Sequence, residues 1–79
     1  MGEQSVMGKK VVVKLHELID KHNISMRELS RRADVRTEAL NELANQKRRN
    51  INFGHLERIA ETFDTNDMNE ILTLVDTDD

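Results

Sequence analysis

The sequence predicts an all-α fold, a single compact domain of five short helices, with short β-strands at the two chain ends as an open alternative. Three observations predict it. From residue 11 onward apolar residues recur at helical spacing, helix-capping residues separate the apolar segments, and 79 residues leave room for one domain. We expect residues 11–75 to form this domain, residues 1–10 to be a flexible N-terminal segment, and residues 76–79 to be an acidic tail.

The first two helices are separated by stop and start signals. The first helix ends near His22, and Asn23 suits the left-handed residue that stops a helix. Ser25 followed by Glu28 is a capping box that begins the second helix. The apolar positions expected to face inward on these two helices are Leu15, Leu18, Ile19, Leu29 and Ala33.

The remaining helices follow the same logic. Asp34 interrupts the apolar pattern before a third helix, residues 45–50 form a polar basic loop, and Asn52 can cap a fourth helix. A turn over 64–67 leads to a fifth segment. The residues expected to face inward are Val35, Ala39, Leu40, Leu43, Ala44, Leu56, Ile59, Ala60 and Phe63, followed by Met68, Ile71 and Leu72 in the fifth segment.

Two runs at opposite ends of the chain, residues 11–14 and 72–75, are rich in residues that favour β-strands. They can pair with each other within one molecule or across a dimer. The alternative is that they are helix ends that cover the core, and the sequence leaves these readings open.

The net charge of −3 argues against a nucleic-acid binder when it is read as an average. Along the chain, however, the charge is unevenly distributed, with a basic segment followed by an acidic one. Residues 27–49 hold seven basic and four acidic residues, whereas residues 57–79 hold one basic and eight acidic residues. Such asymmetry points to nucleic-acid contact by one half, although a helical protein with scattered solvated charges is the plain alternative.

Several classes of protein are not expected. The chain has no cysteine, which excludes disulfides, thiol catalysis and zinc knuckles. Its three histidines are not clustered with other ligands, so we expect no metal site and no cofactor. A chain of this size offers little pocket for catalysis, and it has neither an apolar run of about 20 residues nor a signal-peptide pattern. We therefore expect a cytoplasmic protein that is neither an enzyme nor a membrane protein.

Residues 26–45 have the pattern of a helix-turn-helix motif. Ser30 is the small residue where two helices touch, Asp34 can adopt the left-handed turn, and Leu40 and Leu43 anchor the second helix. One face of that helix is then free to enter a major groove, and Asn41 is of the residue type that pairs with adenine. Arginine pairs with guanine and glutamate with cytosine. The residues expected to point outward on this helix are Arg36, Thr37, Glu38, Asn41, Glu42 and Asn45.

The sequence resembles the phage repressor/Cro type of helix-turn-helix, the Xre-like or lambda-repressor-like family. The resemblance covers about residues 15–72 and lies in ISMRELSRRADVRTEALNELAN, the basic loop QKRRN and INFGHLERIAETFD. It implies that the second helix of the motif reads bases with Arg36, Thr37, Glu38, Asn41 and Glu42. Arg31 lies four residues after Arg27, and a bound phosphate would offset the repulsion between these two like charges. Together with the positions that the resemblance implies, the residues expected to contact phosphates are Ser25, Arg27, Arg31, Asn45, Lys47, Arg48 and Arg49.

This sequence departs from the family pattern at several positions. Met26 stands where the family commonly has Gln, and Arg36 stands where it has a Ser or Thr cap, so Asp34 or Thr37 would have to cap the third helix. Two acids, Glu38 and Glu42, lie on the expected reading face.

The expected function is a sequence-specific regulator of transcription that binds a double-stranded DNA operator as a homodimer. The alternative is a protein-interaction module on the same fold, such as an antirepressor or the antitoxin of a toxin pair. Its acidic C-terminal half would then contact a small protein partner.

Overall fold

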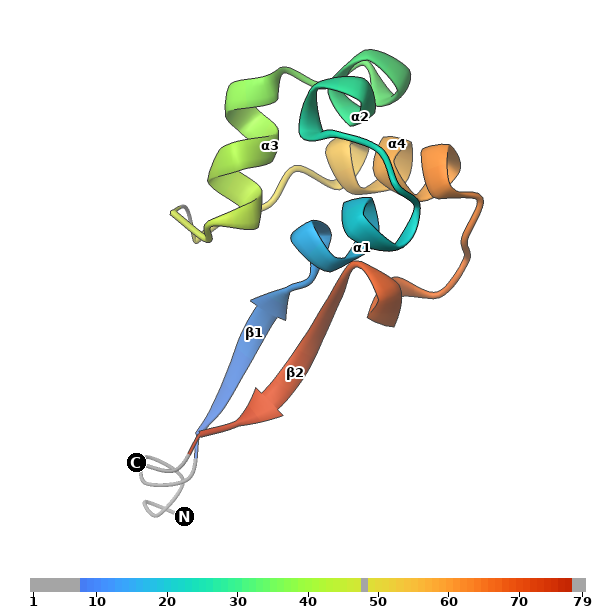
Figure 1. The fold of residues 1–79 in the computed structure, drawn as a ribbon. Coiled ribbons are helices and arrows are strands. Elements are labelled where there is room, and N and C mark those ends of the chain that lie inside the picture. Colours follow the sequence, from blue (N-terminus) through green and yellow to red (C-terminus); the bar gives the residue numbers. More distant parts are fainter. Residues whose placement is uncertain (1–7, 48, 78–79) are drawn as a thin grey trace.

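A computed structural model describes residues 8–47 and 49–77. A strand at each end of this range flanks a helical body (Figure 1). In chain order the elements are β1 (Lys9–Val13), α1 (Leu15–Lys21), α2 (Met26–Ala33), α3 (Thr37–Ala44), α4 (Phe53–Phe63), a 3₁₀ helix (Met68–Glu70) and β2 (Leu72–Asp76). None of the described helices is both long enough and apolar enough to span a membrane.

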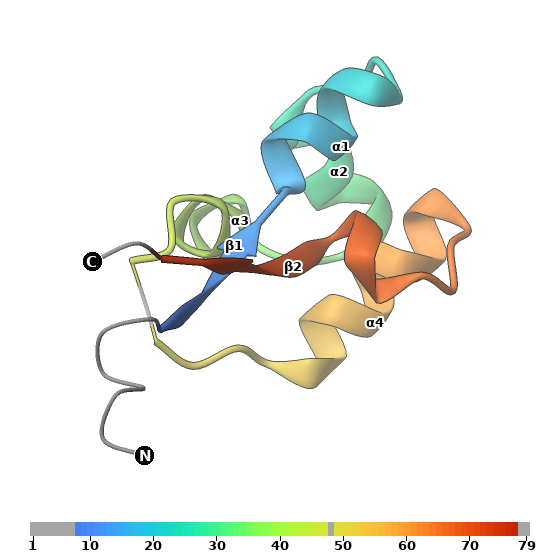
Figure 2. The ribbon, with the colours of Figure 1, turned by 90° about the horizontal axis from the view of Figure 1, so that it is seen from below.

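The two terminal strands pair with each other in an antiparallel sheet within one molecule. Val11 lies opposite Leu74, and Lys9 lies opposite Asp76, with which it forms an ion pair. Figure 1 and the view from below in Figure 2 show this sheet projecting from the helical body beside the end of α3. The prediction that the two terminal runs form strands that pair within one molecule is therefore confirmed. The alternative, that they are helix ends covering the core, is wrong.

The strands are also longer than predicted. β1 includes Lys9 and Lys10, which were expected to belong to the flexible start, and β2 includes Asp76 from the expected acidic tail. Cross-strand pairing of the main chain extends over these polar residues, so hydropathy alone missed them. Gly8 and Thr77 extend the pairing, because the Thr77 N–H donates to the Gly8 carbonyl, and residues 1–7 and 78–79 lie outside the described residues.

The expected fifth helix is wrong. The described chain has four α-helices, and the segment after α4 forms only the single 3₁₀ turn Met68–Glu70, which Asp67 caps by accepting a hydrogen bond from the Asn69 N–H. Leu72 onward then pairs with β1. The segment forms a strand and not a helix because its partner strand lies far away in the sequence, with 67 positions between Lys9 and its partner Asp76. The fold is thus mostly helical with a small sheet, not all-α.

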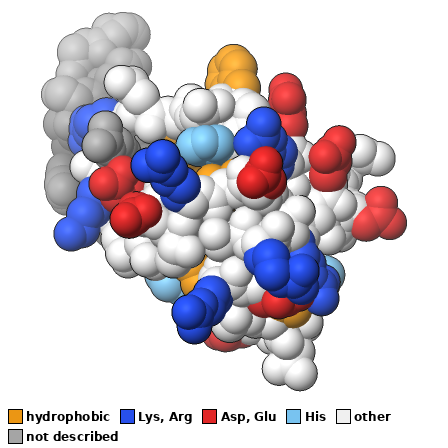
Figure 3. Space-filling view, turned by 90° about the horizontal axis from the view of Figure 1, so that it is seen from above, with side chains coloured by type: hydrophobic (Ala, Val, Ile, Leu, Met, Phe, Trp, Pro, Cys, Tyr) orange, Lys and Arg blue, Asp and Glu red, His pale blue; other side chains and the backbone are white. Residues whose placement is uncertain are grey.

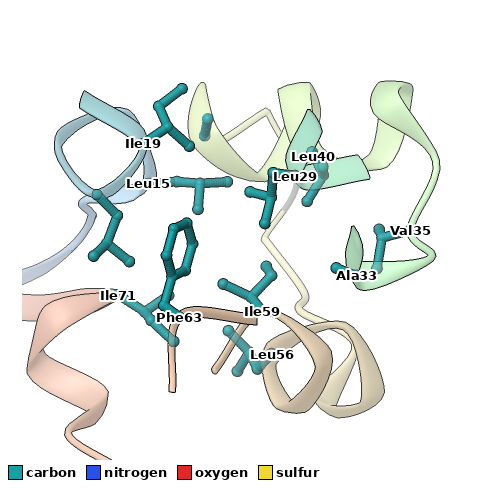
Figure 4. Close-up of a cluster of buried hydrophobic side chains, with 12 residues drawn as sticks. Leu15, Ile19, Leu29, Ala33, Val35, Leu40, Leu56, Ile59, Phe63 and Ile71 are labelled. Carbon is teal, nitrogen blue, oxygen red and sulfur yellow. The ribbon is translucent and has the colours of Figure 1, made fainter. Parts of the chain in front are cut away.

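The hydrophobic core lies between the four helices and the start of β2 (Figure 4). Leu15, Leu29, Leu40, Ile59 and Ile71 are fully buried. Burial of such a side chain contributes about 1.5–3 kcal/mol each. Of the predicted inward residues, those in the core are Leu15, Leu18, Ile19, Leu29, Ala33, Val35, Leu40, Ala44, Leu56, Ile59, Phe63 and Ile71, with Ala39, Leu43, Ala60 and Leu72 packed against them. Met68 is an exception because it is 49% exposed.

Candidate nucleic-acid interface

The turn between α2 and α3 is fixed from both sides. Asp34 adopts the left-handed conformation (φ 58°, ψ 46°), as its residue type predicts, and its N–H donates to the Ser30 carbonyl. The Ser30 hydroxyl donates to the Val35 carbonyl at 2.6 Å. From α4, the Arg58 guanidinium donates to the Asp34 carbonyl at 3.1 Å. These bonds set the angle at which α3 leaves α2.

Helix α3 presents one polar line outward. Thr37, Asn41 and Asn45 lie four residues apart and are exposed, whereas Ala39 and Leu43 on the opposite side of the helix pack against the core. Arg36 and Glu38 are also exposed at the start of the helix. The structure therefore brings four of the five predicted base-reading residues together on the free surface of one helix turn and the next.

The fifth predicted reader, Glu42, lies to one side of this line. It is half-buried and lines an open cleft of about 760 Å³ between α3 and the start of α4. Lys47, Arg49 and His55 line the same cleft. The fold thus places two cations of the basic loop on the Glu42 side of α3.

The start of α3 lacks the side-chain cap that was expected. The N-cap residue is Arg36, whose side chain makes no capping bond, and neither Asp34 nor Thr37 supplies one. The first backbone N–H groups of a helix carry partial positive charge and need acceptors. In α3 the N-cap side chain supplies none.

Comparison with known proteins gives the family. The model of the Cro/C1-type HTH DNA-binding domain matches residues 14–77. The chain belongs to this family. No curated protein and no solved structure matches it.

The phosphate contacts expected of this Cro/C1-type domain come from the start of α2, the end of α3 and the basic loop. Ser25 caps α2 by accepting a hydrogen bond from the Glu28 N–H at 3.0 Å, which leaves its own proton to donate. Arg27 is exposed, as are Asn45 at the end of α3 and the loop residues Lys47 and Arg49. The predicted contact at Arg48 lies outside the described residues. Met26, by contrast, packs against the core.

The capping box of α2 is only half formed. The Glu28 carboxylate, which was expected to bond back to Ser25, instead accepts from Arg31 and Arg32, at 2.5 Å and 2.7 Å. Two adjacent cations compete successfully with one backbone N–H for this acceptor. Both pairs lie at helical spacings, because Arg31 and Arg32 follow Glu28 by three and four residues. Arg31 is 71% exposed and has further donors, so it can bond to Glu28 and to a phosphate together.

Hydrogen bonding to Arg31, followed by that to Arg32, lowers the pKa of Glu28 below its usual value of 4.5. Because the folded-state pKa lies below that of the unfolded chain, this ion-paired group stabilises the fold above pH 4.5. The contribution is lost as pH falls through the folded-state pKa.

We expect the Glu28→Gln variant to lose less thermal stability on acidification than the parent chain. The effect is small because all three side chains are accessible to solvent. Melting temperatures measured at neutral pH and at several values below 4.5 check it. Parallel curves for the two proteins would show that Glu28 carries no such pH dependence.

The charge distribution on the face seen from above, over α2 and α3, is mixed. Figure 3 shows Lys and Arg side chains in several groups with Asp and Glu between them. On this face the Cro/C1-type domain therefore has separate basic points where phosphates can be bound, not one continuous basic stripe.

Proposed function

We propose that this domain is a sequence-specific transcriptional regulator that acts in the cytoplasm on a double-stranded DNA operator, in the manner of the phage repressor and Cro proteins. The observation that carries the proposal is the exposed line Thr37–Asn41–Asn45 on a short helix whose opposite face is locked into the core. A helix held this way can enter a major groove without unfolding any part of the domain.

In this proposal, two sets of contacts have different tasks. Ser25, Arg27, Arg31, Asn45 and the loop cations bind phosphates and fix the orientation of the domain, but they carry no sequence information directly. Arg36, Thr37, Glu38 and Asn41 face base edges and discriminate between them, whereas Glu42 lies at the side of the helix, next to the loop cations. Asn41 is central because it lies in the middle of the exposed line.

We further propose that the domain binds as a homodimer. One motif covers only a half-site, and two motifs about 34 Å apart give useful specificity. Exposed apolar side chains support self-association: Leu74 on β2 is 62% exposed and Phe53 at the start of α4 is 75% exposed. Leu74 does not stand alone, because its cross-strand neighbour Val11 is 43% exposed, so the two form one apolar patch on the sheet.

We expect selection from a pool of random duplexes to enrich a defined sequence with the parent chain. The variant Asn41→Ala then binds the enriched sequence about 1–3 kcal/mol more weakly and tolerates changes at one base pair. Mobility-shift titrations on the enriched sequence and on its single-base variants measure both effects. Asn66→Ala is the matched control, because Asn66 is an exposed asparagine in the turn after α4.

Failure to enrich any sequence would refute sequence-specific binding. An equal loss for Asn41→Ala on enriched and random duplexes would show that Asn41 is not a reader. The same result for Asn41→Ala and Asn66→Ala would exclude a special role for α3.

A second candidate function is protein interaction, as in an antirepressor or an antitoxin. It is favoured by a groove of about 300 Å³ between α4 and the segment before β2. Leu56, Ala60 and Ile71 line it together with the exposed side chains of Phe53 and Met68. Acidic Glu57 and Asp67 also line it, and none of the described residues around it is basic. This surface suits an apolar side chain from a basic partner segment. If no duplex sequence is enriched, protein interaction becomes the leading candidate function.

A further inference from the structure

Helix α3 ends in a conformation that glutamine does not favour. Gln46 adopts a left-handed backbone (φ 55°), its N–H donates to the Leu43 carbonyl, and the N–H of Lys47 donates to the Glu42 carbonyl. This pair of bonds is a Schellman motif, which usually has glycine at the position of Gln46. The other non-glycine residues at positive φ in the described chain are Asn23, Asp34 and Asp64, whose types tolerate it. Glutamine has no such tolerance, so its side chain must do something that glycine cannot.

The side chain of Gln46 bonds to strand β1. Its Oε1 accepts from the Val13 N–H and its Nε2 donates to the Val11 carbonyl, both at 2.9 Å. In an antiparallel strand these main-chain groups point to the same edge. The Lys14 N–H bonds to the Ile71 carbonyl across the sheet, so Val11 and Val13 point to the other edge, away from β2. The amide of Gln46 therefore takes the place of a neighbouring strand.

The two hydrogen bonds from Gln46 to β1 lie where the basic loop begins. Lys47 follows Gln46 directly, and Arg49 lines a cavity of about 390 Å³ with Gln46, Val11 and other residues of β1. No hydrogen bond within the described chain holds Arg49 itself. The position of these two loop cations therefore depends on how firmly Gln46 is attached to the sheet.

We propose that Gln46 is a positioning residue for DNA binding. Through its two bonds to β1 it holds Lys47 and Arg49 in the cleft on the Glu42 side of α3, so that the terminal sheet contributes to DNA affinity without touching DNA. The inference rests on the proposed function. It assigns a role in binding to a side chain that contacts no phosphate and to strands at the far ends of the chain.

The test uses the full chain and a duplex of about 20 base pairs, long enough for two half-sites. Gln46→Gly keeps the Schellman motif and relieves the backbone but removes both side-chain bonds. Gln46→Ala removes the bonds without relieving the backbone. We expect both to bind the duplex about tenfold more weakly at a temperature at which each is fully folded, because two hydrogen bonds that hold the loop are lost. Hydrogen exchange at the Val13 amide becomes faster in both.

Two comparisons separate positioning from a general effect on folding. Asp64→Gly makes the same backbone change at the end of α4, where the side chain forms no such bond, and leaves affinity unchanged or slightly raised through loss of a negative charge. In a chain that already carries Lys47→Ala and Arg49→Ala, Gln46→Gly has no further effect, because there are no loop cations left to position.

Parent-like affinity of Gln46→Gly and Gln46→Ala would overturn the inference while leaving DNA binding intact. So would a tenfold loss that persists without the loop cations, or unchanged exchange at Val13. If the parent chain itself binds no duplex, the proposed function fails and this inference fails with it.

Discussion

Replacing Leu40 with alanine is expected to lower the free energy of unfolding by about 2–5 kcal/mol. Leu40 is fully buried and joins α3 to the core formed by the other helices. A domain of this length has a total stability of only about 4–12 kcal/mol, so the loss is a large part of the whole. We expect the melting temperature to fall by at least about 10 °C. DNA binding is lost with it, because the outward line of α3 is positioned by this side chain.

Thermal or urea unfolding followed by circular dichroism measures the effect. Leu74→Ala is the matched control, since Leu74 is the same residue type but 62% exposed on β2. It should change the free energy of unfolding by well under half as much. Equal losses for the two variants would mean that α3 is not anchored by Leu40, and the geometry of the candidate interface would then lose its basis.

The helices and the motif could be predicted from the sequence because their signals are local. Ser25 and Asn52 bond to backbone N–H groups within three residues, so a short window of sequence contains both partners. The turn at Asp34 could be predicted equally well, because aspartate tolerates the left-handed backbone conformation. These local features also place the outward face of α3, and with it most of the candidate site.

The features that sequence reasoning missed depend on partners far along the chain or on competition between partners. The segment after α4 has helical spacing, yet its last residues pair with β1 because an unpaired strand is available at the other end of the chain. The bonds of Gln46 to β1 span more than 30 residues, and nothing in QKRRN predicts them. Glu28 has three possible donors nearby, and only the structure shows that two arginines are preferred to the backbone of Ser25.

One signal for Gln46 was present in the sequence. Helix α3 ends before the basic loop without glycine, and without asparagine at the residue that turns left-handed. A missing glycine at such a position indicates that a side chain compensates for the backbone conformation. Its partner could not be identified from the sequence, because the strand character of residues 11–13 was itself unresolved.

The second large effect is expected from removing the two described loop cations together. With Lys47→Ala and Arg49→Ala, we expect the logarithm of DNA affinity to fall less steeply with the logarithm of salt concentration, by about two units of slope. Each cation that neutralises a phosphate releases counterions, so each one removed takes about one unit with it. Both side chains are exposed beside α3, where the cleft opens. Binding should weaken on every duplex sequence alike, since phosphate contacts carry no base information.

Lys14→Ala with Lys21→Ala is the matched control, because it removes the same charge from a different surface. These two lysines line a shallow cavity with Glu17 and Glu70 at the start and end of α1. If the control lowers the slope as much as the loop variant does, net charge and not position governs binding. A lowered slope for the loop variant alone, with the preference for the enriched sequence retained, separates the two tasks of the interface: the loop supplies attraction, and α3 supplies discrimination.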